Sequence, residues 1–223
     1  INKGETIAVV GKNGAGKTTF VKLLLRFYDC DSGEILYNGI NIKEYDIESL
    51  RSRLATVFQD YKVFALTIEE NVLCREVDGA SDEKTVQEAL RNSGADSCVE
   101  KLSNGQKTVL TREFDEKGTG LSGGEQQKIA AARMFAKSFD LAILDEPSSA
   151  LDPIAEYKMY ESLIEATKEK TVVYISHRLS SAVLSNRIYV FDNGTVSESG
   201  THDELMKNGG TYATLYSQQF RGI

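Results

Sequence analysis

A glycine-rich loop that ends in lysine and threonine is the first segment of this sequence whose residue types suggest chemistry. The loop, Gly11-Lys-Asn-Gly-Ala-Gly-Lys17-Thr18, fits the pattern G-x-x-x-x-G-K-[ST] and lies between the apolar run Thr6–Val10 and a helical stretch, Thr18–Arg26. Its glycines let successive backbone N–H groups point at an anion, and the following helix adds its positive N-terminal end. The loop therefore predicts a binding site for the phosphates of a nucleotide.

The lysine and the threonine of this loop have separate expected roles. Lys17 reaches the β- and γ-phosphates, and the Thr18 hydroxyl is placed to hold Mg²⁺. The alternative, a chance glycine-rich turn, is a poor fit to a motif that stands between a strand and a helix. The residues that we expect to contact the nucleotide here are Gly11, Asn13, Gly14, Ala15, Gly16, Lys17, Thr18 and Thr19.

Two adjacent acids follow a second apolar run. Asp145 and Glu146 come directly after Leu141–Leu144, so they lie at the carboxyl end of an expected buried strand, where open α/β sheets bind ligands. Asp145 is the expected second anchor for Mg²⁺, and Glu146 can polarise an attacking water. On its own, the segment is better explained as a strand that ends in two solvated acids. Together with the phosphate loop it predicts a hydrolytic site.

A second glycine-rich helix start lies in the middle of the chain. In Leu121-Ser-Gly-Gly-Glu-Gln126, Ser122 is an expected N-cap with Glu125 three residues later, so a long helix begins here. The Ser122 hydroxyl and the amides of Gly123 and Gly124 then form a second phosphate-binding helix end. One nucleotide can use both helix ends only if they come from two chains, which predicts a dimer. The residues alone leave a well-capped helix as an equal alternative.

Strands and helices alternate around these segments. Short apolar runs predict strands and the stretches between them predict helices, which indicates an α/β fold with a mainly parallel sheet flanked by helices. The expected strands are Thr6–Val10, Glu34–Tyr37, Ala55–Phe58, Leu141–Leu144, Thr171–Ile175 and Arg187–Phe191. Because Asn38-Gly39 is a hairpin signal, we also expect a small antiparallel β part.

Residues from about 67 to 138 differ from the rest of the chain, because they are mostly helical and contain no clear strand. Thr67 and Glu70 form an expected capping box, and Ser81–Ser93 is an amphipathic helix that Gly94 ends. We interpret the chain as a single domain with an α/β core of residues 1–66 and 139–223. Residues 67–138 are then an inserted helical subdomain that carries Leu121–Gln126.

The composition argues against several other classes of protein. Hydrophobic residues are 41% of the 223 residues and charged residues 26%, which is typical of a folded domain. The net charge of −7 argues against a nucleic-acid partner. Cys30, Cys74 and Cys98 are far apart and offer no zinc-ligand spacing, so we expect free thiols. No apolar run approaches the roughly 20 residues that span a bilayer, so any membrane role must come through a partner or an attached segment.

Taken together, these segments resemble the nucleotide-binding domain of ABC transporters, in the family's order and over essentially the whole chain. Gly11–Thr18 resembles the Walker A loop, Gln59 the Q-loop, Leu121–Gln126 the signature motif, Leu141–Glu146 the Walker B strand, Ser149–Asp152 the D-loop and His177 the switch histidine. The resemblance implies a P-loop NTPase core, ATP and Mg²⁺ as ligands, and hydrolysis of ATP between two such domains that close head-to-tail.

The resemblance also implies roles for individual residues. The metal ligands would be Thr18, Gln59 and Asp145, and the catalytic residues Lys17, Glu146 and His177. His177 would contact the γ-phosphate and hold Glu146 and the water in place, and Asp152 would reach across the dimer interface. His202, near the C-terminus, is expected to be structural.

Finer features resemble the exporters of this family. They are Phe64–Asn71, Ser176–Ser180 and Gly200–Leu205. Arg112-Glu113-Phe114 is similar to the exporters' X-loop, but Arg112 and Asp115 replace its usual threonine and glycine, which weakens Glu113 as a coupling contact. An exporter ATPase domain would pair with an identical or a different ATPase domain and act on transmembrane domains, at the cytoplasmic face of a plasma or inner membrane.

Two other functions remain as alternatives. A soluble ATP-driven clamp of the same superfamily, acting on nucleic acid or ribosomes, would carry a long coiled-coil insertion or two ATPase domains, and this sequence shows neither. A structural protein that binds but does not hydrolyse nucleotide would be expected to lack Glu146 or His177, and both are present.

The segment before the phosphate loop departs from the family pattern. Family members carry an aromatic residue there that stacks on adenine, whereas the ten residues before Gly11 include none. We therefore expect that the chain is truncated at its N-terminus. Because base–aromatic stacking is worth roughly 1–3 kcal/mol in nucleic-acid complexes, we also expect weaker ATP binding than by an intact domain.

Overall fold

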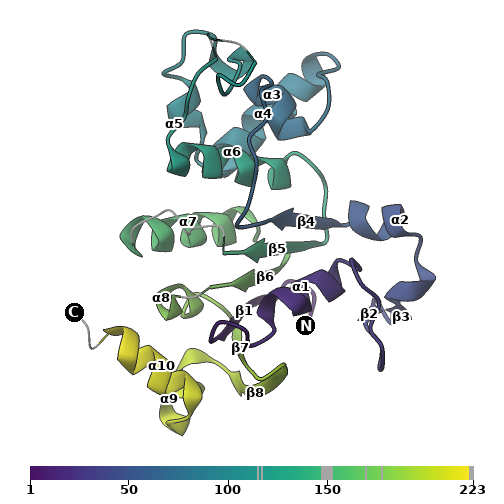
Figure 1. The fold of residues 1–223 in the computed structure, drawn as a ribbon, viewed down its shortest axis with the longest axis vertical. Coiled ribbons are helices and arrows are strands. Elements are labelled where there is room, and N and C mark those ends of the chain that lie inside the picture. Colours follow the sequence, from purple (N-terminus) through teal and green to yellow (C-terminus); the bar gives the residue numbers. More distant parts are fainter. Residues whose placement is uncertain (115, 117, 147–152, 169, 177, 221–223) are drawn as a thin grey trace. The chain divides into compact units, whose positions relative to one another are not determined.

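The computed structural model describes residues 1–223 except 115, 117, 147–152, 169, 177 and 221–223 (Figure 1). The chain divides into two compact units. The first unit consists of Ile1–Thr56, Phe139–Glu146 and Thr167–Ile223, and the second of Val57–Ser138 and the described part of Pro147–Ala166. Each unit is described by itself below.

The first unit is built on a sheet of six strands in the order β4-β5-β6-β1-β7-β8. Their bounds are β1 Thr6–Gly11, β4 Leu54–Val57, β5 Leu141–Asp145, β6 Thr171–Ile175, β7 Arg187–Asp192 and β8 Thr195–Gly200. β1 lies parallel to β6 and to β7, and β5 lies parallel to β6. Only the last hairpin, β7 with β8, is antiparallel in the pairings of this sheet that are described. The predicted α/β fold with a mainly parallel sheet is confirmed.

The central strands are buried along almost their whole length. In β1, Thr6 to Val10 are all buried, and β5 and β6 each contain four consecutive buried residues. Strands covered on both faces need unbroken apolar runs. These strands were therefore predicted from continuous apolar segments rather than from an alternation of apolar and polar residues.

The first unit also contains several helices. They are α1 Lys17–Leu24, α2 Ile47–Ser52, α8 Leu179–Ala182, α9 His202–Asn208 and α10 Thr211–Phe220, with a 3₁₀ turn at Ile42–Glu44. Helix α1 packs against both β1 and β5, so the start of this helix is fixed beside the ends of those strands. The predicted small antiparallel part is the hairpin of β2 (Leu36–Tyr37) and β3 (Ile40–Asn41).

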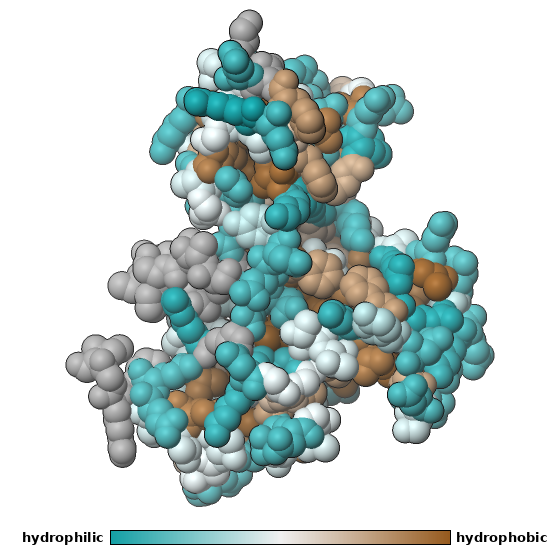
Figure 2. Space-filling model, in the orientation of Figure 1, coloured by the Kyte–Doolittle hydropathy of each residue, from teal (hydrophilic) through white to brown (hydrophobic). Residues whose placement is uncertain are grey.

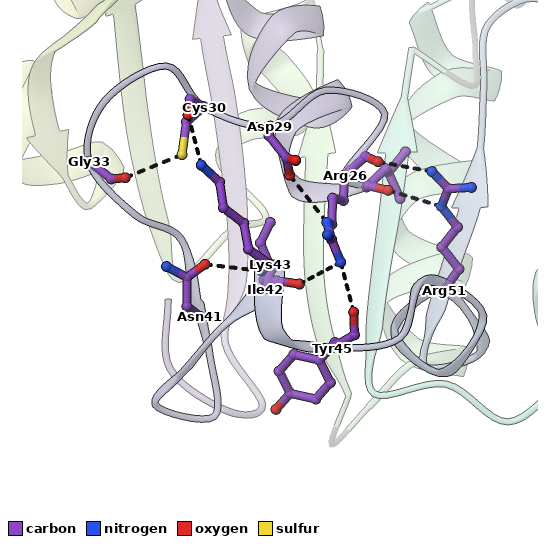
Figure 3. A network of polar contacts seen from close by, with 10 residues as sticks. Arg26, Asp29, Cys30, Gly33, Asn41, Ile42, Lys43, Tyr45 and Arg51 are labelled. Carbon is purple, nitrogen blue, oxygen red and sulfur yellow. Dashed lines mark hydrogen bonds and ion pairs between the residues drawn. The ribbon is translucent and has the colours of Figure 1, made fainter.

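An arginine network ties the C-terminal end of α1 to the loop and helix that follow it (Figure 3). Arg26 adopts a left-handed backbone conformation, with φ of 50°, and its Nη1 donates to the carbonyl oxygens of Ile42 (3.0 Å) and Tyr45 (2.8 Å). Arg51 of α2 donates in turn to the carbonyl oxygens of Leu25 and Arg26, at 3.2 and 2.9 Å. The carbonyls of the two residues that follow α1 thus receive cationic donors, as helix C-termini favour.

Polar side chains anchor the C-terminal helices to the first unit. Glu198 of β8 accepts hydrogen bonds from the first amides of α10, at Thr211 and Tyr212. His202 Nδ1 lies 2.8 Å from the Tyr212 hydroxyl, and its ring packs against Tyr216. These contacts are structural, as was expected for His202.

Apart from Val57, the last residue of β4, and two isolated β-bridges, the regular elements described in the second unit are helices. Its helices are α3 Ile68–Leu73, α4 Ala80–Asn92, α5 Asp96–Val99, α6 Gly123–Phe135 and α7 Pro153–Ala166, with a 3₁₀ turn at Gly105–Lys107. Both α3 and α4 pack on α6. The shared core contains Ile68, Val72, Val86, Leu90, Leu110 and Ile129. The Thr67–Glu70 capping box is confirmed.

The surface is mixed in polarity. On the face drawn in Figure 2, hydrophilic side chains are interspersed with smaller hydrophobic patches. Within the described ranges, no helix has both the length and the apolar character needed to cross a bilayer. Cys30, Cys74 and Cys98 are free thiols, as expected.

Candidate functional site

The glycine-rich loop between β1 and α1 adopts backbone conformations that side chains disfavour. Gly11, Gly14 and Gly16 have φ values of 150°, 79° and 102°. A Cβ atom on Gly11 would lie 2.3 Å from the carbonyl oxygen of Phe191 in β7, so this position has no room for a side chain. One on Gly16 would lie 3.3 Å from the Cα of Gly194. The loop is therefore packed closely against β7 and the turn that follows it.

The start of α1 is open to an anion. Its N-cap, Gly16, is in the left-handed region and supplies no side-chain hydrogen bond to the first turn. Since the first amides of a helix have no partner within the helix, they are free of side-chain competition here. Thr18 and Thr19 are exposed on this turn, and Asn13 and Gly14 are exposed in the loop before it.

Lys17 is the charged centre of this loop. Its side chain is buried, with 5% of the residue exposed, and Nζ donates to the carbonyl oxygens of Gly11 (2.9 Å) and Lys12 (3.1 Å). Burial lowers the pKa of the Lys17 ammonium, while the negative charges of Glu146 and Asp145 act to raise it. The cation is thus held beneath the loop and close to both predicted acids.

Both acids lie at the carboxyl end of β5. Asp145 is buried and pairs in register with Ile175 of β6, and the Glu146 amide donates to the Ile175 carbonyl oxygen at 3.2 Å. Glu146 has φ of 49°, a conformation that costs a residue with a side chain about 1–3 kcal/mol and that often marks functional sites. The chain therefore turns sharply just after Asp145, and the structure brings Lys17, Asp145 and Glu146 together.

The oxygen atoms at this edge suit Mg²⁺. The Thr18 hydroxyl and the Asp145 carboxylate are hard ligands, and Mg²⁺ bound with a nucleotide takes most of its other ligands from phosphate and water. In the described chain, no cluster of three or more His, Cys, Asp or Glu side chains could hold a metal ion by itself. Thr18 and Asp145 thus fit a metal that arrives with its nucleotide.

Three predicted residues are not placed with this group. Gln59 is exposed in the turn after β4 and belongs to the second unit, which is described separately from the phosphate loop. Asp152, with the rest of Ser149–Asp152, and His177 lie outside the described residues. Their roles stay predictions.

The second glycine-rich segment begins α6, and its predicted capping box is confirmed. The Glu125 amide donates to Ser122 Oγ at 3.4 Å, and Glu125 Oε2 accepts from both the amide (2.8 Å) and the hydroxyl (2.7 Å) of Ser122. These hydrogen bonds lower the pKa of the Glu125 carboxyl. Gly123 is exposed and Gly124 partly so. The Ser122 hydroxyl proton is thus bound to Glu125, while the amides of Gly123 and Gly124 belong to the first turn of the helix, where amides have no intrahelical partner.

The segment that resembles an X-loop is exposed. Arg112 Nε donates to the Gly118 carbonyl oxygen at 3.1 Å, and Phe114 is 87% exposed. Asp115 lies outside the described residues. The coupling role of Glu113 stays a prediction.

Sequence reasoning missed one supporting residue of the phosphate loop. The Gly194 amide donates to the carbonyl oxygen of Ala15 at 3.0 Å, so a backbone hydrogen bond ties the β7–β8 turn to the phosphate loop. The Asn193-Gly194 pair marks the turn in the sequence, but a contact between residues so far apart leaves no local signal.

Comparisons with known proteins agree on one family. The family model described as ABC transporter matches residues 1–149. The subtilin transport ATP-binding protein SpaT of Bacillus subtilis is 44% identical over 96% of this chain and 35% of its own length. The ATP-dependent lipid A-core flippase of Haemophilus ducreyi is 40% identical over 99% of this chain and 37% of its own length.

A solved structure agrees with these relatives. A bacterial Atm1-family ABC exporter with ATP bound matches with a TM-score of 0.87 and 35% identity, over 98% of this chain and 37% of that chain. This chain spans little more than a third of the length of the curated relatives that it matches.

Proposed function

Since this chain belongs to the ABC transporter family, we propose that it is the ATP-binding and ATP-hydrolysing domain of an ABC exporter. The observation that carries the proposal is the buried Lys17 ammonium beneath a glycine-rich loop, with Asp145 and Glu146 beside it at the end of β5. The names of the relatives, which include a flippase and a subtilin transport protein, favour an exporter over a soluble clamp.

In this proposal each residue of the first unit has one task. The amides of Gly11–Thr18 and the Lys17 ammonium bind the β- and γ-phosphates. Thr18 and Asp145 would hold Mg²⁺, which neutralises charge on the phosphate oxygens when it is bound. A Glu146 carboxylate oxygen accepts the proton of the attacking water, because it stands one residue beyond the metal ligand at the same strand end.

The second unit would complete the site of another copy. Gly123 and Gly124 of one domain donate their amides to the γ-phosphate held by the loop of its partner, so two domains close head-to-tail around two ATP molecules. Gln59, Asp152 and His177 would act in this closed state, in the roles that the resemblance implies. Opening and closing would drive transmembrane domains at the cytoplasmic face of a membrane.

The direct test is ATP hydrolysis by the 223-residue chain with Mg²⁺. We expect Glu146→Gln to keep ATP affinity while turnover falls by about 100-fold or more, the range for loss of a general base. Glu100→Gln, an exposed acid of the second unit, is the matched control and should keep full turnover. A chain that binds no ATP, or a Glu146→Gln variant with full turnover, contradicts the proposal.

A further inference from the structure

A tyrosine close to Gln59 contacts the start of α6. Tyr61 lies two residues after Gln59, and its hydroxyl donates to the carbonyl oxygen of Gly123 at 2.9 Å. Both residues belong to the second unit.

The segment that follows Tyr61 is also attached near the other end of α6. The buried Asn71 side chain bonds the Phe64 amide (2.8 Å) and carbonyl oxygen (2.9 Å). Arg133 donates to the backbone oxygen of Asn71 (2.9 Å) and to its Oδ1 (3.1 Å), and the guanidinium lies 5.1 Å from the centre of the Phe64 ring. Arg133 is ten residues beyond Gly123, or about 15 Å along the helix. Residues 61–71 are therefore tied to α6 at two distant points.

Apolar packing joins the two attachments. Val63 and Leu121 both pack against the core cluster that contains Ile129 of α6 and Ile68 of α3. Since packed cores do not deform continuously, the 61–71 segment and α6 are expected to move as one body. The hydrogen bond from Tyr61 is then the polar contact between the 61–71 segment and the first turn of α6.

The hydrogen bond from Tyr61 acts on the Gly124 amide because of the oxygen that accepts it. The carbonyl group of Gly123 and the amide of Gly124 form one planar peptide unit, so a restraint on the oxygen also sets the direction of the Gly124 N–H. This unit lies in the first turn of α6, where the helical backbone also restrains it, but the two glycines add no side-chain packing to that restraint. A hydrogen bond to the oxygen also polarises the peptide unit and strengthens its N–H as a donor.

We propose that Tyr61 is a positioning residue that orients the Gly124 amide through its bond to the Gly123 carbonyl, and so links the Gln59 turn to the phosphate-binding start of α6. The inference rests on the proposed function, in which that amide meets the γ-phosphate of a partner's ATP. Loss of the hydroxyl leaves the loop of the first unit intact, so it should impair turnover rather than the first binding of ATP.

Tyr61→Phe tests this, with Tyr28→Phe as the matched control because Tyr28 is 62% exposed in the first unit. Hydrogen exchange of the nucleotide-free chain should be faster in the first turn of α6 for Tyr61→Phe and unchanged for the control. With turnover normalised to bound ATP, Tyr61→Phe should lose about three- to tenfold in kcat, the size expected for one hydrogen bond. Its Kd for ATP should stay within about twofold of the wild type.

Unchanged exchange at residues 122–126 would overturn the positioning role. Faster exchange with kcat unchanged would overturn it too. A rise in the Kd for ATP that accounts for the whole effect would also overturn it, because a general loss of folded protein would explain that result. If the wild-type chain hydrolyses no ATP, the proposed function fails instead, and the exchange measurement still decides whether Tyr61 restrains α6.

Discussion

The two glycine-rich helix starts of this chain offer different things to an anion. Helix α1 begins after Gly16, which supplies no side-chain cap, and the Lys17 ammonium lies beneath its loop. Helix α6 begins after Ser122, whose side chain is bound to the Glu125 carboxylate. The first start therefore offers open amides and a positive charge, and the second offers amides next to a negative charge.

This difference indicates that the two helix starts have separate roles in nucleotide binding. A site with open amides and a cation can bind phosphate by itself. A site with a carboxylate in its first turn is suited to complete a bound nucleotide, because the helix dipole already stabilises the acid that is present. We therefore expect the first unit to set the affinity for ATP and the second unit to respond to ATP that is already bound.

Removal of the Lys17 ammonium should change the affinity for ATP more than any other substitution considered below changes its own measured property. Lys17→Ala should weaken ATP binding by about 100-fold, because charged hydrogen bonds contribute roughly 1.5–3 kcal/mol. Calorimetric titration measures the Kd, and Lys22→Ala, in the last turn of the same helix, is the control. Binding that survives Lys17→Ala unchanged would mean that the loop amides suffice and that the contrast between the two helix starts is wrong.

Glycine substitutions in the closely packed phosphate loop should have the next largest effect, which is a loss in the free energy of unfolding. Gly11→Ala and Gly14→Ala both place a side chain at positive φ, but only at Gly11 does the new Cβ meet a backbone atom, at 2.3 Å. We expect Gly11→Ala to lower the free energy of unfolding by about 1–3 kcal/mol more than Gly14→Ala does. Urea denaturation of both variants measures this difference. Equal losses would show that the contact with Phe191 has no energetic weight.

The two units also differ in how they bury charge. Glu69 of the second unit is 7% exposed, and its Oε2 atom has no hydrogen-bond partner among the described residues, in contrast to the bonded Lys17 ammonium. Burial, with help from Glu83 and Glu70 and against Lys107, raises the pKa of the Glu69 carboxyl. The protonated form is thus favoured in the folded state, so the stability that Glu69 contributes is lost as pH rises through its raised pKa.

Glu69→Gln should therefore stabilise the chain at pH 7 and lose that advantage near pH 4. The expected gain is about 1 kcal/mol, the lower end of the cost of an unsatisfied buried group. Unfolding midpoints at the two pH values measure it, with Glu100→Gln as the exposed control. A destabilised Glu69→Gln variant at pH 7 would show that the carboxylate has a favourable partner in the folded chain.

The smallest expected effect concerns the acid at the second helix start. Glu125→Gln keeps an oxygen that can accept from Ser122 but removes the charge that would face a partner's γ-phosphate. ATP-driven association should tighten by about two- to fivefold, in line with charge–dipole energies of 0.3–1 kcal/mol. Sedimentation at several ATP concentrations measures this. Weaker association would mean that Glu125 serves the closed dimer as an anion.

Local patterns in the sequence predicted much of the fold and part of the site. The capping boxes at Thr67 and Ser122 involve residues three positions apart, so they can be read directly. The buried strands were visible because residues covered on both faces must be apolar. The approach of Lys17 to Asp145 followed from the rule that ligands bind at the carboxyl ends of parallel strands.

Contacts between distant residues could not be predicted in this way. Gly194 supports the phosphate loop through Ala15, and Tyr61 bonds Gly123 across 62 positions. Neither contact leaves a periodicity or a motif, because each depends on how whole elements pack. The engagement of the Ser122 hydroxyl with Glu125 was missed for a different reason, since a capping pattern does not say where a proton points.

Head-to-tail closure of two copies around ATP can be measured through the molar mass of the Glu146→Gln variant in solution. Light scattering would be recorded with and without Mg²⁺ and ATP, at concentrations shown to saturate the variant. We expect a monomer without nucleotide and a dimer, of twice 24.6 kDa, with it. A saturated variant that stays monomeric would contradict head-to-tail closure for this chain.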